Sequence, residues 1–264
     1  MEISGVSTDS RSVRGGDLFV ALQGERFDGH AYLEQARDQG AVAALVSAVA
    51  DDALPQLKVE NTQEALGRLG AYNRNLYTGP LVAITGSSGK TTVKNMVHAV
   101  LSRRGETLAT EGNYNTEIGV PQTLLRLHPG VEFAVVEMGA ARAGDIDWLC
   151  ELARPTVALL LNAMPAHLEG FGDLATVVRE KSSISEGLAP AGVLIINADF
   201  EDLVNACRAR DARLVTFGRS DDADYRATDI CLEGRASRFT VDGTEIHLPL
   251  AGAGNVENAL AAWA

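Results

Sequence analysis

The chain has 264 residues, enough for two domains of ordinary size, and its 46% apolar content is typical of a globular α/β protein. The formal net charge of −12, from 23 basic and 35 acidic residues, argues against general binding to nucleic acid or to anionic membranes. The three cysteines are isolated and lack metal-ligand spacing, and we see no signal-peptide pattern and no apolar run of bilayer length. These features predict a cytoplasmic protein that holds any anion by local geometry.

Residues 1–78 predict a small α/β domain. Strands are expected at residues 18–22, 42–47 and 56–59, with helices at 31–39 and 62–76. Asn61 precedes the second helix as an N-cap, and Glu64 stands near the N3 position as in a capping box. Gly79 and Pro80 then favour a linker, so a second domain is expected over residues 79–264.

Two stretches of the first domain are too polar and too rich in glycine to be core: Ser7-Thr8-Asp9-Ser10-Arg11 and Gly24-Glu25-Arg26-Phe27-Asp28-Gly29-His30. Each offers hydroxyl or carboxylate oxygens and a cation near a strand end, which would suit a sugar nucleotide. The residues alone favour another interpretation, in which both stretches are capped turns around a solvated salt bridge.

From Pro80 onward strands and helices alternate, which predicts a doubly wound, mostly parallel sheet. The strands are expected at residues 81–85, 107–110, 133–137, 156–162, 193–197 and 214–217, and the helices at 91–104, 118–127, 145–152, 174–186 and 201–208. The alternating segments 227–232, 237–241 and 245–250 predict an antiparallel extension of this sheet. The last helix begins near Gly254 and runs about two turns, so we expect a further domain to be missing from this chain.

The strand at 81–85 is followed by the turn Gly86-Ser87-Ser88-Gly89 and then by Lys90-Thr91-Thr92 at the start of a helix. A strand, a glycine turn and a helix N-terminus in this order bind polyphosphates. The turn amides would point at the anion, Lys90 would neutralise phosphate oxygens and the Thr91 hydroxyl would ligate Mg²⁺. Ile84 stands where the common pattern has its first glycine, and a purely structural turn is the alternative. We predict that this loop binds a nucleoside triphosphate.

Polar residues stand where the predicted strands end, at the edge of the sheet where ligands bind. Glu137 ends a hydrophobic strand, which is costly unless a cation faces it; Mg²⁺ is the favoured partner and a structural salt bridge the alternative. His167 follows the strand that ends in Asn162, and its residue type fits a metal ligand and a loop cap about equally. For Lys181, the sequence alone favours a surface lysine paired with the preceding Glu180.

Six motifs extend over nearly the whole chain. They are Ser-Thr-Asp-Ser-Arg at 7–11, Gly-Glu-Arg-Phe-Asp-Gly-His at 24–30, Thr-Gly-Ser-Ser-Gly-Lys-Thr-Thr at 85–92, Gly-Asn-Tyr-Asn-Thr-Glu-Ile-Gly-Val-Pro at 112–121, Glu-Met-Gly-Ala at 137–140 and His-Leu-Glu-Gly-Phe-Gly at 167–172. Together they resemble the Mur ligases of bacterial cell-wall synthesis. The two serines of the phosphate loop and the 24–30 motif favour the members that add D-Ala-D-Ala.

The resemblance implies an α/β enzyme of three domains: a UDP-substrate domain (1–78), a central ATP-binding domain (79–264) and a Rossmann-like C-terminal domain that is expected to be missing here. ATP would phosphorylate the terminal carboxylate of UDP-MurNAc-tripeptide, and the amine of D-Ala-D-Ala would attack the acyl phosphate and release phosphate. Lysine and Mg²⁺ would screen the repulsion between the carboxylate and the γ-phosphate. We expect a monomer that binds neither nucleic acid nor membrane and is inactive in this truncated form.

The resemblance also implies roles residue by residue. Catalysis would depend on Lys90, Glu137, His167 and Lys181. ATP would be bound by Gly86, Ser87, Ser88, Gly89, Lys90, Thr91, Thr92, Asn115, Asn255 and Asn258. Metal ions would be held by Thr91, Glu137, His167 and a carbamylated Lys181, and the UDP substrate by Ser10, Arg11, Asp28, Gly29, His30, Asn113 and Thr116. For Lys181 and for the two polar stretches, these roles replace the interpretations that the residues alone favoured.

The chain departs from the family pattern at a few positions. Gly254 stands where the family usually has His before Asn255, and Ser182-Ser183 stands where it often has Gly-Glu. The leading helix and strand usual in this type are also expected to be absent. Two alternatives remain: a sister ligase that adds another amino acid or dipeptide, and a non-catalytic module that binds UDP precursors and nucleotides.

Overall fold

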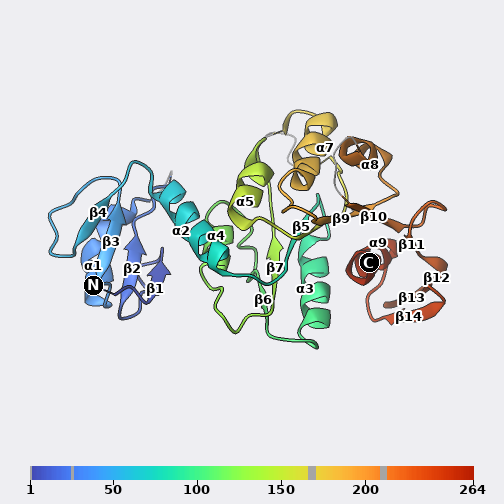
Figure 1. Ribbon diagram of the computed structural model, residues 1–264, viewed down its shortest axis with the longest axis horizontal. Coiled ribbons are helices and arrows are strands. Elements are labelled where there is room, and N and C mark those ends of the chain that lie inside the picture. Colours follow the sequence, from blue (N-terminus) through green and yellow to red (C-terminus); the bar gives the residue numbers. More distant parts are fainter. Residues whose placement is uncertain (1, 25–26, 166–170, 209–212) are drawn as a thin grey trace.

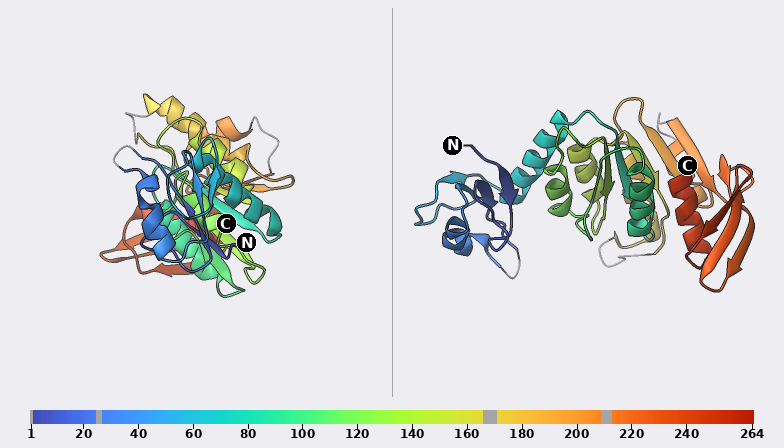
Figure 2. Two further views of the ribbon diagram at one scale, coloured as in Figure 1. Left: turned by 90° about the vertical axis from the view of Figure 1, so that its left-hand side faces the viewer. Right: turned by 90° about the horizontal axis from the view of Figure 1, so that it is seen from below.

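Three sheets follow one another along the molecule, each built from a separate part of the chain (Figure 1). The computed structural model describes residues 2–24, 27–165, 171–208 and 213–264. A four-stranded sheet, a seven-stranded central sheet and a three-stranded sheet lie in a row from the N-terminal to the C-terminal end (Figure 2, right). Over these residue ranges, no helix combines the length and the apolar character needed to cross a membrane.

The N-terminal sheet is parallel and has the strand order β1-β2-β3-β4. Its strands are β1 (Gly5–Ser7), β2 (Asp17–Val20), β3 (Ala43–Val46) and β4 (Gln56–Lys58). One face packs Phe19 against Ala36 of α1 (Leu33–Asp38), which follows the short helix η1 (Gly29–Tyr32). The other face packs Val20 and Leu45 against Leu66 of α2 (Thr62–Leu76). Successive side chains of a strand point to opposite faces, so β2 contributes to both cores.

Helix α2 connects the N-terminal sheet to the central one (Figure 1). Asn61 caps it by accepting hydrogen bonds from the backbone N–H groups of Gln63 (2.9 Å) and Glu64 (3.1 Å), which confirms the predicted N-cap. The Glu64 carboxylate pairs with Arg68 one turn later, and its role therefore differs from that in the predicted capping box.

Two glycines let α2 approach the helices of the central sheet closely. A Cβ atom on Gly67 would lie 2.9 Å from the Trp148 ring of α5 (Asp145–Ala153). A Cβ atom on Gly70 would lie 2.9 Å from the Pro121 backbone of α4 (Gly119–Leu124). Both distances are shorter than van der Waals contact, so larger residues at these positions would push α2 away from the central sheet.

Buried Arg74 fastens the C-terminal end of α2 to the C-terminal end of α5. Its guanidinium donates hydrogen bonds to the carbonyl oxygens of Ala153 (2.6 Å), Arg154 (2.9 Å) and Tyr77 (2.8 Å). Carbonyl groups at helix C-termini lack helical partners and carry partial negative charge. One cation therefore satisfies three such acceptors where the two helices meet.

The central sheet is parallel and has the order β11-β10-β9-β8-β5-β7-β6. Its strands are β5 (Leu81–Thr85), β6 (Thr107–Ala109), β7 (Phe133–Glu137), β8 (Val157–Leu160), β9 (Val193–Asn197), β10 (Arg213–Gly218) and β11 (Tyr225–Arg226). The connecting helices, besides α4 and α5, are α3 (Lys90–Leu101), α7 (Leu174–Ser182) with the short η2 (Ser183–Ser185), and α8 (Glu201–Arg208). The predicted doubly wound parallel sheet is confirmed, whereas β1 and β11 were not expected from the sequence.

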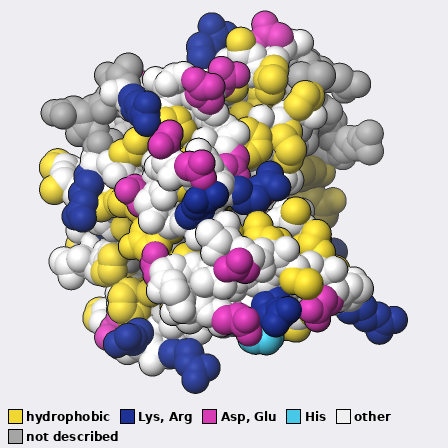
Figure 3. All heavy atoms as spheres, turned by 90° about the vertical axis from the view of Figure 1, so that its right-hand side faces the viewer, with side chains coloured by type: hydrophobic (Ala, Val, Ile, Leu, Met, Phe, Trp, Pro, Cys, Tyr) yellow, Lys and Arg dark blue, Asp and Glu magenta, His cyan; other side chains and the backbone are white. Residues whose placement is uncertain are grey.

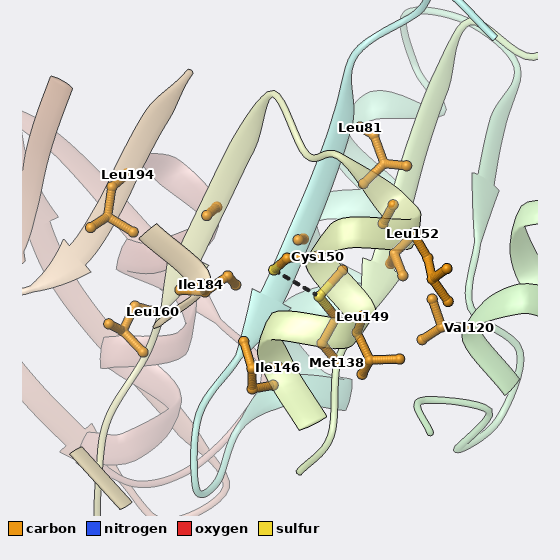
Figure 4. Close-up of a cluster of buried hydrophobic side chains, with 14 of the residues drawn as sticks. Leu81, Val120, Met138, Ile146, Leu149, Cys150, Leu152, Leu160, Ile184 and Leu194 are labelled. Carbon is orange, nitrogen blue, oxygen red and sulfur yellow. Dashed lines mark hydrogen bonds between the residues drawn. The ribbon is translucent and has the colours of Figure 1, made fainter. Parts of the chain in front are cut away.

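Both faces of the central sheet are apolar. In β7, Ala134 and Val136 belong to the core formed with α4, α5 and α7, while Val135 packs with α3 and α9 (Ala253–Trp263). Figure 4 shows the first of these cores, where the Cys150 Sγ lies 3.8 Å from the Met138 Sδ. Burial raises the pKa of the Cys150 thiol to about 12, so this cysteine acts as a small apolar residue.

The antiparallel strands near the C-terminus form a sheet of their own. Strands β12 (Thr228–Glu233), β13 (Ala236–Val241) and β14 (Thr244–Leu248) pair in that order, which confirms the antiparallel pairing. The prediction that they extend the central sheet is wrong, because the strand paired to β10 at that edge is the parallel β11. Instead, Phe239 and Val241 of β13 pack with α9. Figure 3 shows this end of the molecule, where acidic and basic side chains are interspersed.

Replacing Arg74 by Met should lower the free energy of unfolding by about 2–3 kcal/mol, because buried carbonyl groups lose a charged donor. Urea unfolding followed by circular dichroism would measure the loss. Arg68→Met is the matched control, since Arg68 lies on the same helix in an exposed pair with Glu64 and should contribute less than about 0.5 kcal/mol. Equal losses in the two variants would contradict the role given to Arg74.

Candidate functional site

The loop after β5 enters α3 at Gly89, the N-cap residue, whose φ is +82°. Glycine adopts this angle without the strain that a Cβ atom would cause. Within the described residues no side chain caps α3, so the N–H groups at its start are available to an anion. The Lys90 Nζ donates to the Gly86 carbonyl oxygen (2.7 Å), which places the ammonium group over the loop.

The electrostatics of the loop also favour an anion. Burial lowers the pKa of Lys90, and the negative charge of Glu137 acts in the opposite direction. A partly desolvated ammonium group next to uncapped helix N–H groups gives a strong local positive potential. Residues 86–92 thus have the context that a phosphate-binding loop requires, with a buried strand before them and a helix after them.

Glu137, the last residue of β7, is only 1% exposed. Its Oε1 accepts a hydrogen bond from the Asn115 Nδ2 (2.7 Å), and the Thr91 Oγ1 lies 3.0 Å from Oε2. Its backbone N–H donates to the Thr110 Oγ1 (3.0 Å). The buried Lys94 Nζ lies 3.8 Å from Oε2. Both interpretations of Glu137 therefore have a structural basis: Lys94 supplies a salt bridge, and Thr91 supplies a second oxygen for a metal ion.

The oxygens of Thr91 and Glu137 fit Mg²⁺. In nucleotide sites this ion is commonly held by one or two protein oxygens together with phosphate oxygens and water. Across the described part of the chain, no three His, Cys, Asp or Glu side chains cluster as a metal site. His167, the predicted ligand of a second metal ion, lies outside the described residues. A metal ion held by Thr91 and Glu137 would therefore complete its coordination with nucleotide and water.

A cavity of about 200 Å³ brings Lys90, Asn115, Thr116 and Lys181 together. Lys181 lies on α7 and is 3% exposed, so its interpretation as a surface lysine is wrong. Burial first, and then the charge of Lys90, lower the pKa of Lys181 to about 8, while Glu180 acts in the opposite direction. An amine with such a pKa is partly neutral near neutral pH, and the neutral amine is the form that reacts with electrophiles.

Glu180 does not serve as the partner of Lys181 but caps a neighbouring helix. Its buried carboxylate accepts hydrogen bonds from the backbone N–H groups of Gly144 (2.7 Å) and Ile146 (2.7 Å), at the N-terminus of α5. Consecutive residues of a helix point in different directions, so Glu180 holds α7 against α5 while Lys181 lines the cavity. The sequence does not reveal this contact, because the partners of Glu180 lie far upstream in the chain.

Asn162, which follows β8, shapes the phosphate loop. Its Oδ1 accepts a hydrogen bond from the Ser88 backbone N–H (3.0 Å), and its Nδ2 donates to the Ser88 carbonyl oxygen (3.3 Å). Its own carbonyl oxygen accepts from the Ser87 backbone N–H (3.2 Å). The polar residue at this strand end therefore orders the turn at residues 86–89.

A second cavity, of about 400 Å³, lies where the phosphate loop meets α9. Its polar lining includes Ser88, Asn255 and Asn258, and a Cβ atom on Gly89 would collide with the Asn258 amide. Gly254 also lines it, so no side chain projects from that position. The apolar lining comes from Leu161, Met164, Phe200 and Phe217. An apolar cavity with amide groups at its edge can accommodate a planar base next to bound phosphates.

The first polar stretch of the N-terminal region forms a capped turn. Arg11 pairs with Asp9 (2.6 Å), its side chain is 80% exposed, and its hydrogen bonds lower the pKa of Asp9 to about 2. The Ser10 Oγ donates to the Gln35 Oε1 (2.8 Å). These are the features of the alternative interpretation, a capped turn with a solvated salt bridge. The role of Ser10 and Arg11 in binding the UDP substrate stays a prediction.

The second polar stretch is ordered by His30. Its backbone N–H donates to Asp28 (3.0 Å), and its Nδ1 lies 2.6 Å from the same carboxylate oxygen. Its Nε2 accepts from the Ser47 backbone N–H (2.9 Å), which places the ring proton on Nδ1. Gly29 is required here, because a Cβ atom would lie 2.7 Å from the Leu22 carbonyl oxygen.

A polar cavity of about 270 Å³ lies beside this stretch, and no local sequence pattern predicts it. Its lining comes from separate segments and consists of Gln23, Ser47, Glu60, Asn61, Thr62 and Gln63. Four residues predicted to bind the UDP substrate contact other residues of the N-terminal region in this structure: Ser10, Arg11, Asp28 and His30. The first polar stretch also contacts a helix of the central sheet, because the Gln122 Nε2 of α4 donates to the Thr8 Oγ1 (2.5 Å).

Two family models match the chain. Residues 84–264 match the Mur ligase middle domain, and residues 2–74 match the Mur ligase family, catalytic domain. The UDP-N-acetylmuramoyl-tripeptide–D-alanyl-D-alanine ligase of Escherichia coli (strain K12) is 46% identical over 268 residues, which cover 99% of this chain and 59% of that protein. The protein of the same name from Bacillus subtilis (strain 168) is 38% identical over 274 residues, with 99% and 58% covered.

Solved structures agree with these matches. MurF from Acinetobacter baumannii has a TM-score of 0.93 and 38% identity, and the match covers 99% of this chain and 58% of that one. A MurF ligase from Thermotoga maritima in complex with ADP has a TM-score of 0.88 and 31% identity, with 98% and 61% covered. The chain thus spans about three-fifths of the length of these relatives.

Labelling of Lys181 by a small amine reagent such as cyanate should reach half its maximal rate near pH 8. A lysine in an unstructured model peptide, the control, should require a pH about two units higher. The folded state disfavours the charged form of Lys181, so its burial costs stability below pH 8, and this cost disappears as the pH rises towards 10.5. Mass spectrometry of the labelled peptides would measure both rates, and identical pH profiles would contradict the assignment.

Proposed function

Because this chain belongs to the Mur ligase family, we propose that it provides the substrate-binding and ATP-binding parts of a ligase that adds D-Ala-D-Ala to UDP-MurNAc-tripeptide. Relatives with this printed name are 33–46% identical to it over nearly its whole length. The chain spans 59% of the length of the first of these relatives, so we propose the activity for the full-length ligase and not for this chain alone.

One observation supports this function above all others. The phosphate loop, the buried Glu137 with Thr91 against it, and the cavity shared by Lys90 and Lys181 lie together at the carboxyl ends of the central strands. This arrangement offers a triphosphate site, oxygens for a metal ion and, in Lys90, a cation for an anionic substrate. A ligase that joins a carboxylate to an amine at the expense of ATP needs all three.

The proposed reaction has two steps. The terminal carboxylate of UDP-MurNAc-tripeptide attacks the γ-phosphorus of ATP, which gives an acyl phosphate and ADP. The amine of D-Ala-D-Ala then attacks the acyl carbon, phosphate leaves, and the new amide bond remains. Lys90 and the backbone N–H groups at the start of α3 would hold the phosphates, because the N–H groups of Ser87 and Ser88 are already bonded to Asn162. Asn115 would orient Glu137 through its hydrogen bond. When bound at Thr91 and Glu137, Mg²⁺ would neutralise charge on the phosphate oxygens.

We propose further that Lys181 is carbamylated. Its neutral amine would add CO₂ and lose a proton, which would turn a cation beside Lys90 into an anion that Lys90 attracts. The buried position and the pKa of about 8 support this, because both favour the reactive neutral amine. His167 is proposed as a ligand of a second metal ion.

The remaining roles follow the same proposal. Residues 1–78 would form the UDP-substrate domain and 79–264 the ATP-binding domain of a cytoplasmic monomer. The adenine side of ATP would lie in the cavity lined by Asn255 and Asn258. The UDP substrate would contact Ser10, Arg11, Asp28, Gly29, His30, Asn113 and Thr116.

Phosphate release from ATP tests the proposal against its two alternatives. Release by the full-length ligase should require Mg²⁺ and UDP-MurNAc-tripeptide, and should increase when D-Ala-D-Ala is added. Turnover with UDP-MurNAc-L-Ala but not with the tripeptide would assign the chain to a sister ligase. If calorimetry shows that the chain binds ATP and the tripeptide but no phosphate is released, the chain by itself is a binding module.

In the full-length ligase, Lys181→Ala should lower phosphate release by about 10–100-fold, because the site loses a group that orients a metal ion. Short-chain carboxylates such as acetate should restore part of the activity by occupying the space of the carbamate. Lys58→Ala, which removes an exposed lysine, is the control for the change of charge. Wild-type activity in Lys181→Ala would refute carbamylation as part of the mechanism.

A further inference from the structure

Lys94 is a buried lysine for which the proposed reaction has no use. It lies one turn after Lys90 on α3 and is 4% exposed. Its Nζ donates to the Gly112 carbonyl oxygen (3.2 Å) and lies 3.8 Å from the Glu137 Oε2. Burying an ammonium group is costly unless it is paired, and these two acceptors are the partners that the structure provides.

We propose that Lys94 is a positioning residue that balances the Glu137 carboxylate when no metal ion is bound. It thereby keeps the affinity of this carboxylate for a free divalent cation low, so that the metal ion binds together with the nucleotide. The inference rests on the proposed function, in which Thr91 and Glu137 hold Mg²⁺.

The contacts of the Glu137 carboxylate show how Lys94 positions it. Asn115 donates to Oε1 (2.7 Å), the Thr91 hydroxyl donates to Oε2 (3.0 Å), and the Lys94 ammonium group lies 3.8 Å from Oε2. Lys94 also binds Gly112, at the start of the loop that carries Asn115. The ammonium group therefore joins the carboxylate and the loop, and both oxygens have a partner without any ligand.

The charge of Lys94 has a second consequence. A cation so close to the carboxylate reduces the negative potential that an incoming divalent cation would meet at Glu137. A metal ion that arrives with a nucleotide brings phosphate charges of its own and is less affected. Lys94 thus favours the metal–nucleotide complex over the free metal ion.

A lysine with only a structural role would behave differently. Its loss would lower the stability of the fold and, by loosening the carboxylate, would weaken metal binding as well. The proposal predicts opposite signs: lower stability without metal and stronger binding of the metal ion alone. The sign of the change in metal affinity therefore separates the two roles.

Thermal unfolding with EDTA, and with Mg²⁺ or Mn²⁺ but no nucleotide, tests this. Lys94→Met and Lys94→Gln should melt below the wild type in EDTA and should bind the metal ion at least about tenfold more tightly, because a nearby positive charge has been removed. Lys94→Arg keeps the charge and should retain the low metal affinity of the wild type. Lys58→Met removes the same charge at an exposed site and serves as the matched control.

A metal affinity in Lys94→Met and Lys94→Gln that equals or falls below that of the wild type would overturn the inference. If Lys94→Met is unfolded in EDTA, metal ion alone should restore its folded state, and failure to do so would also overturn it. The proposed function fails by a different result, namely nucleotide binding to the wild type that responds neither to Mg²⁺ nor to Glu137→Gln.

Discussion

The Glu137 carboxylate lies buried at the end of β7 with donors from separate segments around it. A carboxylate in such a position costs several kcal/mol unless it is paired, so the fold must bring its partners there. Helix α3 contributes Thr91 and Lys94, and the loop after β6 contributes Asn115. The phosphate loop enters α3 directly before Thr91, so its position depends on the same cluster. One buried charge thereby fixes the segments that form the nucleotide site relative to one another.

The position of the N-terminal sheet depends on a second set of contacts, those of α2. The helix packs on the N-terminal sheet through Leu66 and on the central helices through Gly67 and Gly70. Arg74 then fastens its end to α5. Since α2 contributes to both regions, a shift of this helix would move the N-terminal sheet relative to residues 86–92. The hydrogen bond between Thr8 and Gln122 provides a further contact between the N-terminal region and α4.

Much of this architecture could be predicted because its signals are local. The strand at 81–85, the glycine turn and the start of α3 are adjacent in sequence, and the alternation of strands and helices determines a parallel sheet. The N-cap at Asn61 is equally local. The strand that pairs with β10 could not be predicted, because a two-residue strand such as β11 leaves almost no pattern in the sequence. The three later strands form a separate sheet, in which β13 packs with α9.

The site residues show the same division. Glu137 could be recognised because a charge at the end of an apolar strand needs a partner. The roles of Lys94 and Glu180 could not, since each depends on groups that only the fold brings near. The surface interpretation of Lys181 was wrong because it assumed that adjacent helix residues pair, whereas Glu180 points to α5 and Lys181 lines the cavity.

Two ammonium groups, those of Lys90 and Lys181, line one small cavity of a protein whose net charge is −12. The overall charge repels anionic ligands at long range, so the proposed binding of ATP must depend on local groups such as Lys90 and the N–H groups at the start of α3. The charged form of Lys181 is destabilised in this cavity, because burial and the nearby charge of Lys90 both oppose it. The conditions that destabilise the ammonium form also supply the neutral amine that can react with CO₂. A carbamate there would replace the repulsion from Lys90 by attraction, so the arrangement that costs stability in the unmodified protein would hold the modified residue in place.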